Sequence, residues 1–264
     1  MPGGGASSAH IVANTNYSRL ERWHDACSYC VSMNALLSPR SPASPPPSSP
    51  SIPSAPFVRG GVLAAVRRLR YEVYCLERRF VDAALCAEGQ ESDEYDPHAV
   101  HFAATTPSGS VVATLRLVLD SPLGFPLEAH ADGLIEARPG TERARTGEIS
   151  RLIVAPDYRA GTIRQPLMLL GLFRHLYEEC GRLGLGYLVA GMEGSLARLL
   201  RRLGILFLPL GATINYFGEV VPYGATVASM RRGYENVLDY ERTCLIGSAS
   251  PFRYFRVSAE DLAR

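Results

Sequence analysis

Glu148–Val154, which reads EISRLIV, is the stretch that decides the fold of this chain. Its β-branched and apolar residues are typical of a strand. Side chains alternate between the two faces of a strand, so we expect Glu148, Ser150 and Leu152 at its outward positions. The position of this strand in the chain, with a hairpin before it and a strand after it, places it near the middle of a sheet.

Working outward from this strand, hydrophobic periodicity predicts alternating helices and strands. The expected elements are a helix stripe of Val62, Val66, Leu69, Val73, Leu76 and Phe80; strands Ala99–Thr106 and Ser110–Leu119; a helix Thr162–Arg182; a strand Gly186–Met192; a helix Ser195–Leu203; strands Ile205–Leu210 and Ile214–Val220; and a closing helix within Pro222–Tyr240. This order predicts an α/β (α+β) domain with a mixed central sheet flanked by helices.

The first part of the chain has a different composition. Ser38–Pro56 reads SPRSPASPPPSSPSIPSAP, which offers little apolar surface for a core and few backbone donors. We therefore expect residues 1–56 to be a disordered Pro/Ser-rich N-terminal extension. The folded domain is expected to occupy residues 57–264.

Composition excludes several classes of function. The 264 residues carry a net charge of +1, which gives no sign of a nucleic-acid partner, and all 27 basic residues are arginine, which excludes lysine chemistry. The longest apolar stretch, Leu203–Ile214, is too short for stable membrane insertion and contains Pro209. The six cysteines are scattered, as reduced thiols in a cytoplasmic protein would be.

Four carboxylates gather in Glu91–Asp96, which reads ESDEYD. Carboxylates this close repel one another unless a cation or arginine neutralises them. Such a run is typical of a solvated surface loop. A calcium loop is a weaker alternative, because the spacing lacks the glycine and the distal glutamate of an EF-hand. A third alternative pairs the carboxylates with arginines in a rigid polar wall or an ammonium-binding pocket.

Arg70, Arg116 and Arg151 each lie in an otherwise apolar segment. An arginine in a strand usually faces solvent. If these three face inward, they need carboxylate partners because an unpaired buried charge is costly. The acidic stretch Glu91–Asp96 is the expected source of those partners.

Glu148, with Ser150 and Arg151, is the candidate for direct chemistry. A partly desolvated carboxylate has a raised pKa and can take a proton from an ammonium group. A salt bridge at the strand edge is the structural alternative. The Cys27-x-x-Cys30 pair lies in the expected extension and has no second pair, and the histidines show no ligand spacing, so no metal site is expected.

Taken together, these residues resemble the acyl-homoserine-lactone (autoinducer) synthases. The matching positions are Arg70-x-x-x-Tyr74-x-x-x-x-x-Phe80, Glu91-x-Asp93-x-x-Asp96, Arg116-Leu117 and Glu148-x-Ser150-Arg151. The segments RYEVYCLERRF, DEYDPHAVHF, RLVLDSPLGFPLE and EISRLIV resemble still more closely the exosortase-associated (PEP-CTERM) acyltransferases and the N-acyl amino acid synthases. The resemblance covers roughly residues 57–240.

This resemblance implies a GNAT-like acyl-CoA N-acyltransferase fold, in which the acyl-phosphopantetheine arm lies between two splayed strands. It also implies an ion-pair cluster beside the acceptor site and a carboxylate that helps to deprotonate the acceptor amine. Carried over to this chain, the cluster is Arg70, Asp93, Asp96, Arg116 and Arg151, and the carboxylate is Glu148. The amine would attack the thioester directly, with backbone N–H groups stabilising the oxyanion.

The chain departs from the autoinducer synthases at the expected acyl and acceptor pockets, with Tyr74 for their usual Phe, Phe80 for Trp and Gly147 for a frequent Trp. Residues 155–167, APDYRAGTIRQPL, lack the glycine spacing with which acetyltransferases cradle coenzyme A.

We therefore expect long-chain acyl transfer from acyl carrier protein to the amine of an amino acid or similar small acceptor, with no cofactor. A non-catalytic acyl-carrier-binding or regulatory protein and a signal synthase using S-adenosylmethionine are the alternatives. Paired arginines such as Arg67-Arg68 and Arg201-Arg202 are either solvated helix faces or a docking patch for the carrier protein.

Overall fold

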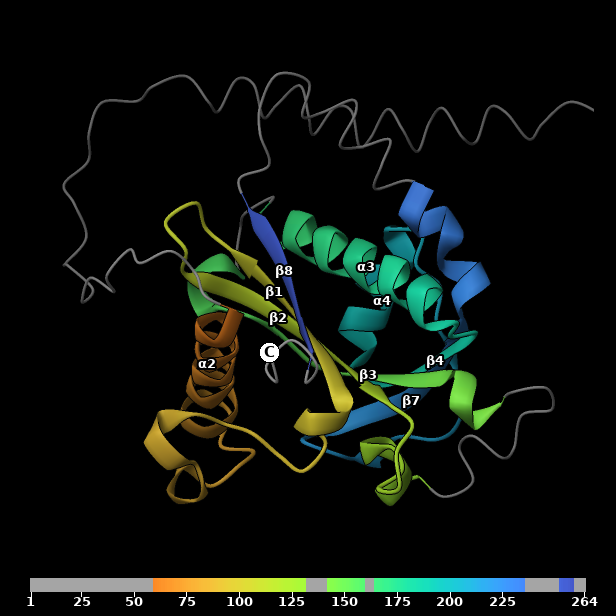
Figure 1. Cartoon of the computed structure of the whole chain (residues 1–264). Coiled ribbons are helices and arrows are strands. Elements are labelled where there is room, and N and C mark those ends of the chain that lie inside the picture. The colour runs from red at the N-terminus through yellow and green to blue at the C-terminus, as the bar shows by residue number, and fades with distance from the viewer. Residues whose placement is uncertain (1–58, 132–141, 160–163, 236–251, 259–264) are drawn as a thin grey trace, which may run out of the picture. The chain divides into compact units, whose positions relative to one another are not determined.

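The computed structural model describes residues 59–131, 142–159, 164–235 and 252–258. The expected N-terminal extension, residues 1–56, lies outside these ranges, as does the Cys27-x-x-Cys30 pair. The described residues form a mixed sheet with helices on both of its faces (Figure 1), as the order of predicted elements indicated.

The sheet runs in the order β5-β7-β4-β3-β2-β1-β8, with β6 added on β7. The strands are β1 (Ala99–Thr105), β2 (Val111–Leu119), β3 (Thr146–Val154), β4 (Tyr187–Met192), β5 (Leu208–Pro209), β6 (Ile214–Asn215), β7 (Glu219–Thr226) and β8 (Arg253–Ser258). The β3–β4 pair is parallel, and the remaining pairs are antiparallel. The predicted β1–β2 hairpin and the central place of β3 are both confirmed.

The α-helices that flank the sheet within the described residues include α2 (Arg59–Arg70), α3 (Arg164–Leu183) and α4 (Gly194–Arg202). Neighbouring residues of β1 show that α2 and α3 cover opposite faces, since Phe102 packs in the core cluster of α3 and Ala103 packs in that of α2. Among the described residues, no helix is both long and apolar enough to cross a membrane.

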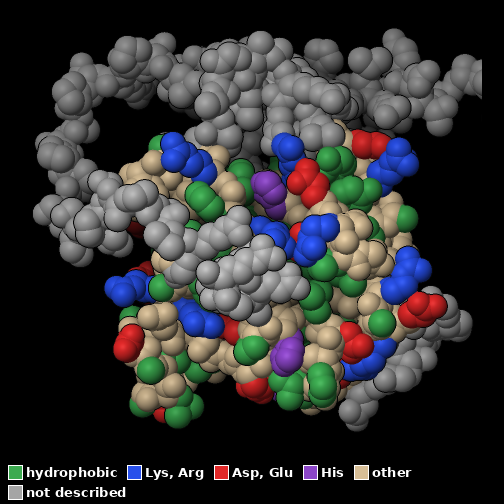
Figure 2. Space-filling view, in the orientation of Figure 1, with side chains coloured by type: hydrophobic (Ala, Val, Ile, Leu, Met, Phe, Trp, Pro, Cys, Tyr) green, Lys and Arg blue, Asp and Glu red, His purple; other side chains and the backbone are tan. Residues whose placement is uncertain are grey.

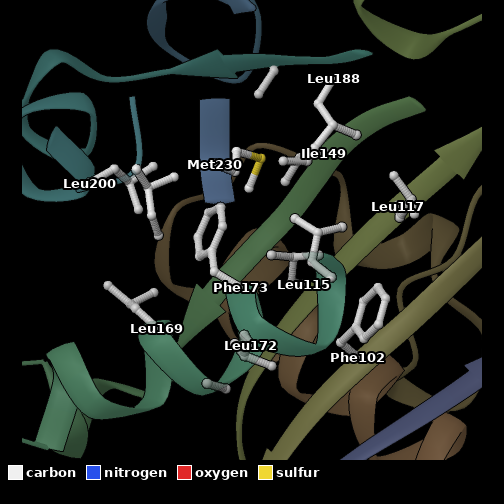
Figure 3. Packing of buried hydrophobic residues seen from close by; sticks show 14 of the residues in the cluster. Phe102, Leu115, Leu117, Ile149, Leu169, Leu172, Phe173, Leu188, Leu200 and Met230 are labelled. Carbon is white, nitrogen blue, oxygen red and sulfur yellow. The ribbon is translucent and has the colours of Figure 1, made fainter. Parts of the chain in front are cut away.

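The larger core lies between α3 and the sheet. Leu169, Leu172 and Phe173 of α3 share one buried cluster with Leu115 of β2 and Ile149 of β3 (Figure 3). These leucine and phenylalanine side chains recur at helical spacing, so one face of α3 is buried from Met168 to Cys180. This packing holds α3 against β3, the strand that carries the candidate catalytic residues.

The helical stripe predicted up to Phe80 does not continue as an α-helix. After α2 the chain forms a π-helical segment, Tyr71–Glu77, in which Arg78 N–H donates to the Val73 carbonyl at 2.8 Å. A π turn takes more residues than an α turn, which rotates the following side chains. The prediction that Leu76 is buried is therefore wrong: Leu76 is 54% exposed, and Cys75 is buried instead.

The predictions for the second half of the sheet were partly wrong. Strands expected at Ile205–Leu210 and Ile214–Val220 are only two residues long, because β7 starts at Glu219 and takes both as edge partners. The segment expected to hold a closing helix, Pro222–Tyr240, begins as strand, continues as the 3₁₀ helix Val227–Met230 and is α-helical at 231–235, so this helix is confirmed within the described residues. Strand β8 was not predicted at all.

A side chain at Gly147 would collide with leucine side chains of the core unless they moved. A Cβ atom built there would lie 2.7 Å from Leu117 Cδ1 and 3.2 Å from Leu185 Cδ1, because this position of β3 faces the core under α3. Gly147 stands where the resembling synthases often carry Trp. The indole that shapes their pocket therefore has no counterpart at this position.

Candidate active site

The central strands β3 and β4 separate part-way along their length. Their parallel ladder joins Thr146–Ile149 to Tyr187–Ala190 and ends there, although β3 continues to Val154. A cavity of about 330 Å³ opens at this point. Its walls come from the π-helical segment, from β3 beyond Ile149, from the end of β4, and from the residues before β7. A volume of this size suits a small-molecule ligand.

A β-bulge in β3 gathers polar groups on one face. Arg116 of β2 pairs with Ser150 and Thr114 pairs with Ile153, so Arg151 and Leu152 together oppose a single residue. Arg151 has a φ of 51°, the left-handed conformation typical of the first residue of such a bulge. The prediction that Leu152 shares a face with Ser150 is therefore wrong: Leu152 packs on the core of α3, and the Arg151 side chain joins Ser150 on the α2 face.

Arg70, Arg116 and Arg151 come from three different elements and meet the acidic loop in one buried cluster. Arg70 binds Asp96 at 2.9 and 3.0 Å and also contacts Glu91. The other contacts within the cluster are Arg116 Nη1 to Asp96 at 2.7 Å and to Asp93 at 2.5 Å, Arg151 Nη2 to Glu91 at 2.9 Å and to Asp93 at 3.0 Å, and Arg116 Nε to Ser150 Oγ at 2.9 Å. Three buried guanidinium groups therefore face three carboxylates, and the partly exposed Arg67 adds a fourth, with its Nε 3.4 Å from Asp96 Oδ2.

The charges within this cluster hold it in its ionised state. Burial alone would raise the pKa of Glu91, but the charges of Arg151 and Arg70 outweigh it and lower that pKa to about 2. The pKa of Asp96 is also lowered, because Arg70 and Arg116 oppose the effect of burial. Of the alternatives for the acidic stretch, pairing with arginine is the one that these contacts match. Glu91 also belongs to the cluster, although it is not among the cluster residues that the resemblance implied.

Glu148 lies fully buried on the same face of β3, beside this cluster. Its Oε2 accepts the Leu127 backbone N–H at 2.8 Å, and its Oε1 has no hydrogen-bond partner among the described residues. Burial raises the pKa of Glu148 to about 8, although the Leu127 N–H and the charges of Arg116 and Arg151 act in the opposite direction. The expected salt bridge at the strand edge is absent from the described contacts of Glu148.

The next residues of β3, Ile149 and Ser150, line the cavity. Tyr216 also lines the cavity. Burial raises the pKa of Tyr216, and the nearby charge of Glu148 raises it further. Glu148 itself is not among the lining residues, but it directly precedes Ile149 and Ser150 on β3, and its Oε1 has no hydrogen-bond partner among the described residues. Such a group can take a proton from a ligand as the pH approaches its pKa.

Comparison with known proteins fits this geometry. The family profile described as "Acetyltransferase (GNAT) domain" matches residues 69–169, from the end of α2 into α3. The fold is the GNAT fold. The domain match and the similar solved structures together identify the chain as an acyl-transferring enzyme. No curated protein sequence matches the chain significantly.

Several solved structures share the GNAT architecture. The acyl-homoserine lactone synthase BjaI, described as CoA-dependent and solved with SAM and isopentyl-CoA, is 24% identical and has a TM-score of 0.55, covering 72% of this chain and 84% of its own. MesI, another synthase described as CoA-dependent, is 25% identical with a TM-score of 0.52, covering 71% and 90%. The AHL synthase LasI is 17% identical with a TM-score of 0.54, covering 68% and 90%.

An aromatic wall borders the cavity next to the ion-pair cluster. The rings of Tyr74, Phe80 and Phe217 contact one another with centroids 5.7 to 5.9 Å apart. The Arg151 guanidinium lies over Tyr74 at 4.9 Å and over Phe217 at 5.0 Å. Tyr74 and Phe80 were predicted as pocket residues, whereas Phe217 and Tyr216 were not. The sequence offered one sign of these two residues, which is that they form an aromatic pair before Gly218. Nothing in the neighbouring sequence indicates that this pair packs against the segment that follows α2.

Among the residues that the structure describes, no group of three or more His, Cys, Asp or Glu side chains is arranged to bind a metal ion. The acidic loop is neutralised by arginine, as described above.

The raised pKa of Glu148 predicts how the stability of the protein depends on pH. In the unfolded chain this carboxyl ionises near 4.5, the ordinary pKa of a glutamate, but in the folded protein it ionises only near 8. Folding therefore favours the protonated form, and Glu148 lowers the free energy of unfolding increasingly as the pH rises from about 4.5 to about 8. Each pKa unit between the two values corresponds to about 1.4 kcal/mol.

We therefore expect a Glu148→Gln variant to be more stable than the wild type by a few kcal/mol at pH 9, and this difference to shrink toward pH 5. Urea unfolding of both proteins at a series of pH values measures it. A difference that stays constant between pH 5 and pH 9 would show that Glu148 titrates normally.

Proposed function

We propose that this protein is an N-acyltransferase that moves a long-chain fatty acyl group from acyl carrier protein to the amine of an amino acid or a similar small acceptor. The observation that carries the proposal is Glu148, a fully buried carboxyl whose Oε1 has no hydrogen-bond partner among the described residues and which directly precedes the cavity-lining residues Ile149 and Ser150 on β3. An acyl-transfer reaction between a thioester and an amine needs a group that removes a proton from the amine. Glu148 is positioned for that role.

In this proposal the acyl-phosphopantetheine arm enters between β3 and β4. The β3 residues beyond Ile149 have no ladder partner on β4, so their backbone groups can bond to an extended arm. Apolar residues such as Leu152, Met192 and Phe207 line the cavity and suit an acyl chain. At the cavity edge, Arg78 and Arg159 are partly exposed, and guanidinium groups match the geometry of a phosphate.

The acceptor approaches from the side of the ion-pair cluster. Glu148, when ionised, takes a proton from the ammonium group of the acceptor, directly or through a water molecule. The free amine attacks the thioester carbonyl, an amide bond forms, the C–S bond breaks, and the carrier thiol leaves with a proton. Backbone N–H groups of β3 stabilise the oxyanion that forms on the carbonyl oxygen.

The residues around Glu148 have supporting roles. The Arg116 guanidinium donates to Ser150 Oγ and fixes this side chain on the cavity wall, so we assign Ser150 to positioning. Arg151 packs on Tyr74 and Phe217 while it binds the acidic loop, so it joins the aromatic wall to the cluster. Arg70, Asp93 and Asp96 hold that cluster rigid beside the acceptor.

Two features support the carrier protein as donor and the cytoplasm as compartment. Residues 155–167 lack the glycine spacing that cradles the pyrophosphate of coenzyme A. Cys75, Cys86 and Cys180 are free thiols in the described part of the chain, as is usual in a reducing compartment. The resemblance of Arg70–Phe80 to exosortase-associated acyltransferases supports a setting beside that system.

A coenzyme A thioester is the second candidate donor, because BjaI and MesI are described as CoA-dependent. S-adenosylmethionine is the corresponding alternative acceptor, since BjaI was solved with SAM. On the face seen in Figure 2, basic and acidic side chains lie interspersed, so docking of an acidic carrier protein there would rest on individual arginines.

A product scan tests the proposal. Purified protein is incubated with palmitoyl-acyl carrier protein or with palmitoyl-coenzyme A, each with a pool of amino acids and, separately, with S-adenosylmethionine. Mass spectrometry then identifies new amides. We expect an N-acyl amino acid at least ten times faster from the carrier-protein donor. A lactone product from S-adenosylmethionine, or carrier-protein binding without any amide, would contradict the proposal.

A further inference from the structure

Cys75, the residue after Tyr74 of the aromatic wall, lies in contact with Cys86. Their Sγ atoms are 3.4 Å apart, and both thiols are free. Cys75 belongs to the π-helical segment, and Cys86 follows a short turn at Ala83–Leu85. This pair has no place in the proposed acyl transfer, because neither cysteine lines the cavity.

The local structure holds both sulfur atoms in position. On one side, the π turn buries Cys75 so that it is only 4% exposed, while its neighbour Leu76 faces solvent. On the other side, the Asp82 carboxylate accepts the Ala84 N–H at 2.9 Å, and the Cys86 N–H donates to the Ala83 carbonyl at 3.2 Å. A disulfide bond is about 2.0 Å long, so the two sulfurs need to approach by only about 1.4 Å from their 3.4 Å separation.

We propose that Cys75 and Cys86 form a reversible disulfide in the presence of a hydroperoxide. Cys86 is partly exposed and reacts first: its thiolate attacks the peroxide oxygen and becomes a sulfenic acid, and hydroxide leaves. The Cys75 thiol then attacks the Cys86 sulfur, the S–S bond forms, and water leaves. In total, two thiols lose two hydrogen atoms and one hydrogen peroxide is reduced to two water molecules.

The position of the pair gives the disulfide a structural consequence. It closes a loop between the segment that carries Tyr74, Arg78 and Phe80 of the cavity wall and the stretch that leads to Glu91 of the ion-pair cluster. A cross-link over so short a loop restricts the unfolded chain and ties the wall to the cluster. We expect the melting temperature to rise by roughly 5–10 °C on oxidation.

Peptide mapping tests the proposal on the full chain, independently of acyl transfer. Reduced protein is treated with hydrogen peroxide, remaining thiols are blocked with N-ethylmaleimide, and the protein is digested with trypsin without reduction. Cleavage after Arg78 and Arg79 separates the two cysteines, so the disulfide appears as peptide 71–78 joined to peptide 80–116. We expect this cross-linked species and the rise in melting temperature, and we expect dithiothreitol to reverse both.

Two variants serve as controls. Cys180→Ala removes a buried thiol away from the pair and should leave the cross-link and the thermal shift unchanged. Cys86→Ser should abolish both. The proposal is overturned if peroxide converts Cys86 to sulfinic acid while Cys75 stays available for alkylation after unfolding. It is also overturned if Cys86 links to any other cysteine of the chain.

Discussion

Glu148→Gln will lower the rate of amide formation at pH 8 by at least about 100-fold, because removal of a general base typically costs 100-fold to 10,000-fold in rate. The substitution keeps the size of the side chain and an oxygen that can accept the Leu127 N–H, so the loss cannot come from a collapsed site. Initial rates of product formation, measured by mass spectrometry with the donor and acceptor found in the product scan, give the comparison.

Glu72→Gln is the matched control. Glu72 is an exposed carboxylate on the π-helical segment, outside the cavity and outside the ion-pair cluster. The same chemical change there should leave the rate within about twofold, since surface substitutions away from such features have small effects. A Glu148→Gln enzyme that keeps more than a tenth of the wild-type rate would remove Glu148 from the mechanism.

Arg70→Met will lower the free energy of unfolding by about 3–5 kcal/mol, the largest effect on stability that we expect from one side chain. The Arg70 side chain is 0% exposed, and its partners Glu91 and Asp96 are 2% and 1% exposed. Methionine fills most of the space but leaves these carboxylates with one cation fewer, in a place that water does not reach. Chemical denaturation at pH 7 measures the change.

The control for this prediction is Arg231→Met. Arg231 pairs with Glu235 at 2.9 Å, but the two side chains are 73% and 56% exposed. An exposed ion pair one helical turn apart contributes about 0.3–0.5 kcal/mol, so the variant should unfold close to the wild type. If Arg70→Met loses no more stability than Arg231→Met, the buried cluster is not a structural support of the site.

The parts of the fold that local pattern determines could be predicted from the sequence. The β1–β2 hairpin, strand β3 and the long helix α3 each have a clear period of apolar residues. The pairing of three arginines with the acidic loop was only one of the alternatives that the residues left open, and the cluster was otherwise implied by the resemblance to the autoinducer synthases. The cost of an unpaired buried charge explains why inward-facing arginines need such partners.

The parts that depend on distant contacts could not be predicted. Strand β8 exists because Val257 and its neighbours pair with β1, more than 150 residues earlier in the chain. Phe217 joins the aromatic wall only through contact with Tyr74 and Phe80. Neither contact leaves a signal in the local sequence around these residues.

Two local irregularities also escaped prediction, and both shape the site. The π-helical segment rotates Leu76 out to solvent, and the bulge at Arg151 moves a side chain from one face of β3 to the other. Each shifts the regular repeat of apolar residues by one position, and a shift of one residue cannot be recognised from the apolar pattern alone. Such departures from ideal geometry concentrate at functional sites.

The pH dependence of amide formation is the most direct test of Glu148 as the base. The rate at saturating donor and acceptor is measured from pH 6 to pH 10 for the wild type and for Glu148→Gln. We predict that the wild-type rate rises with a midpoint near 8, the pH at which Glu148 ionises, and that the variant is slow and lacks this rise. A variant whose rate and pH profile match those of the wild type would contradict the account.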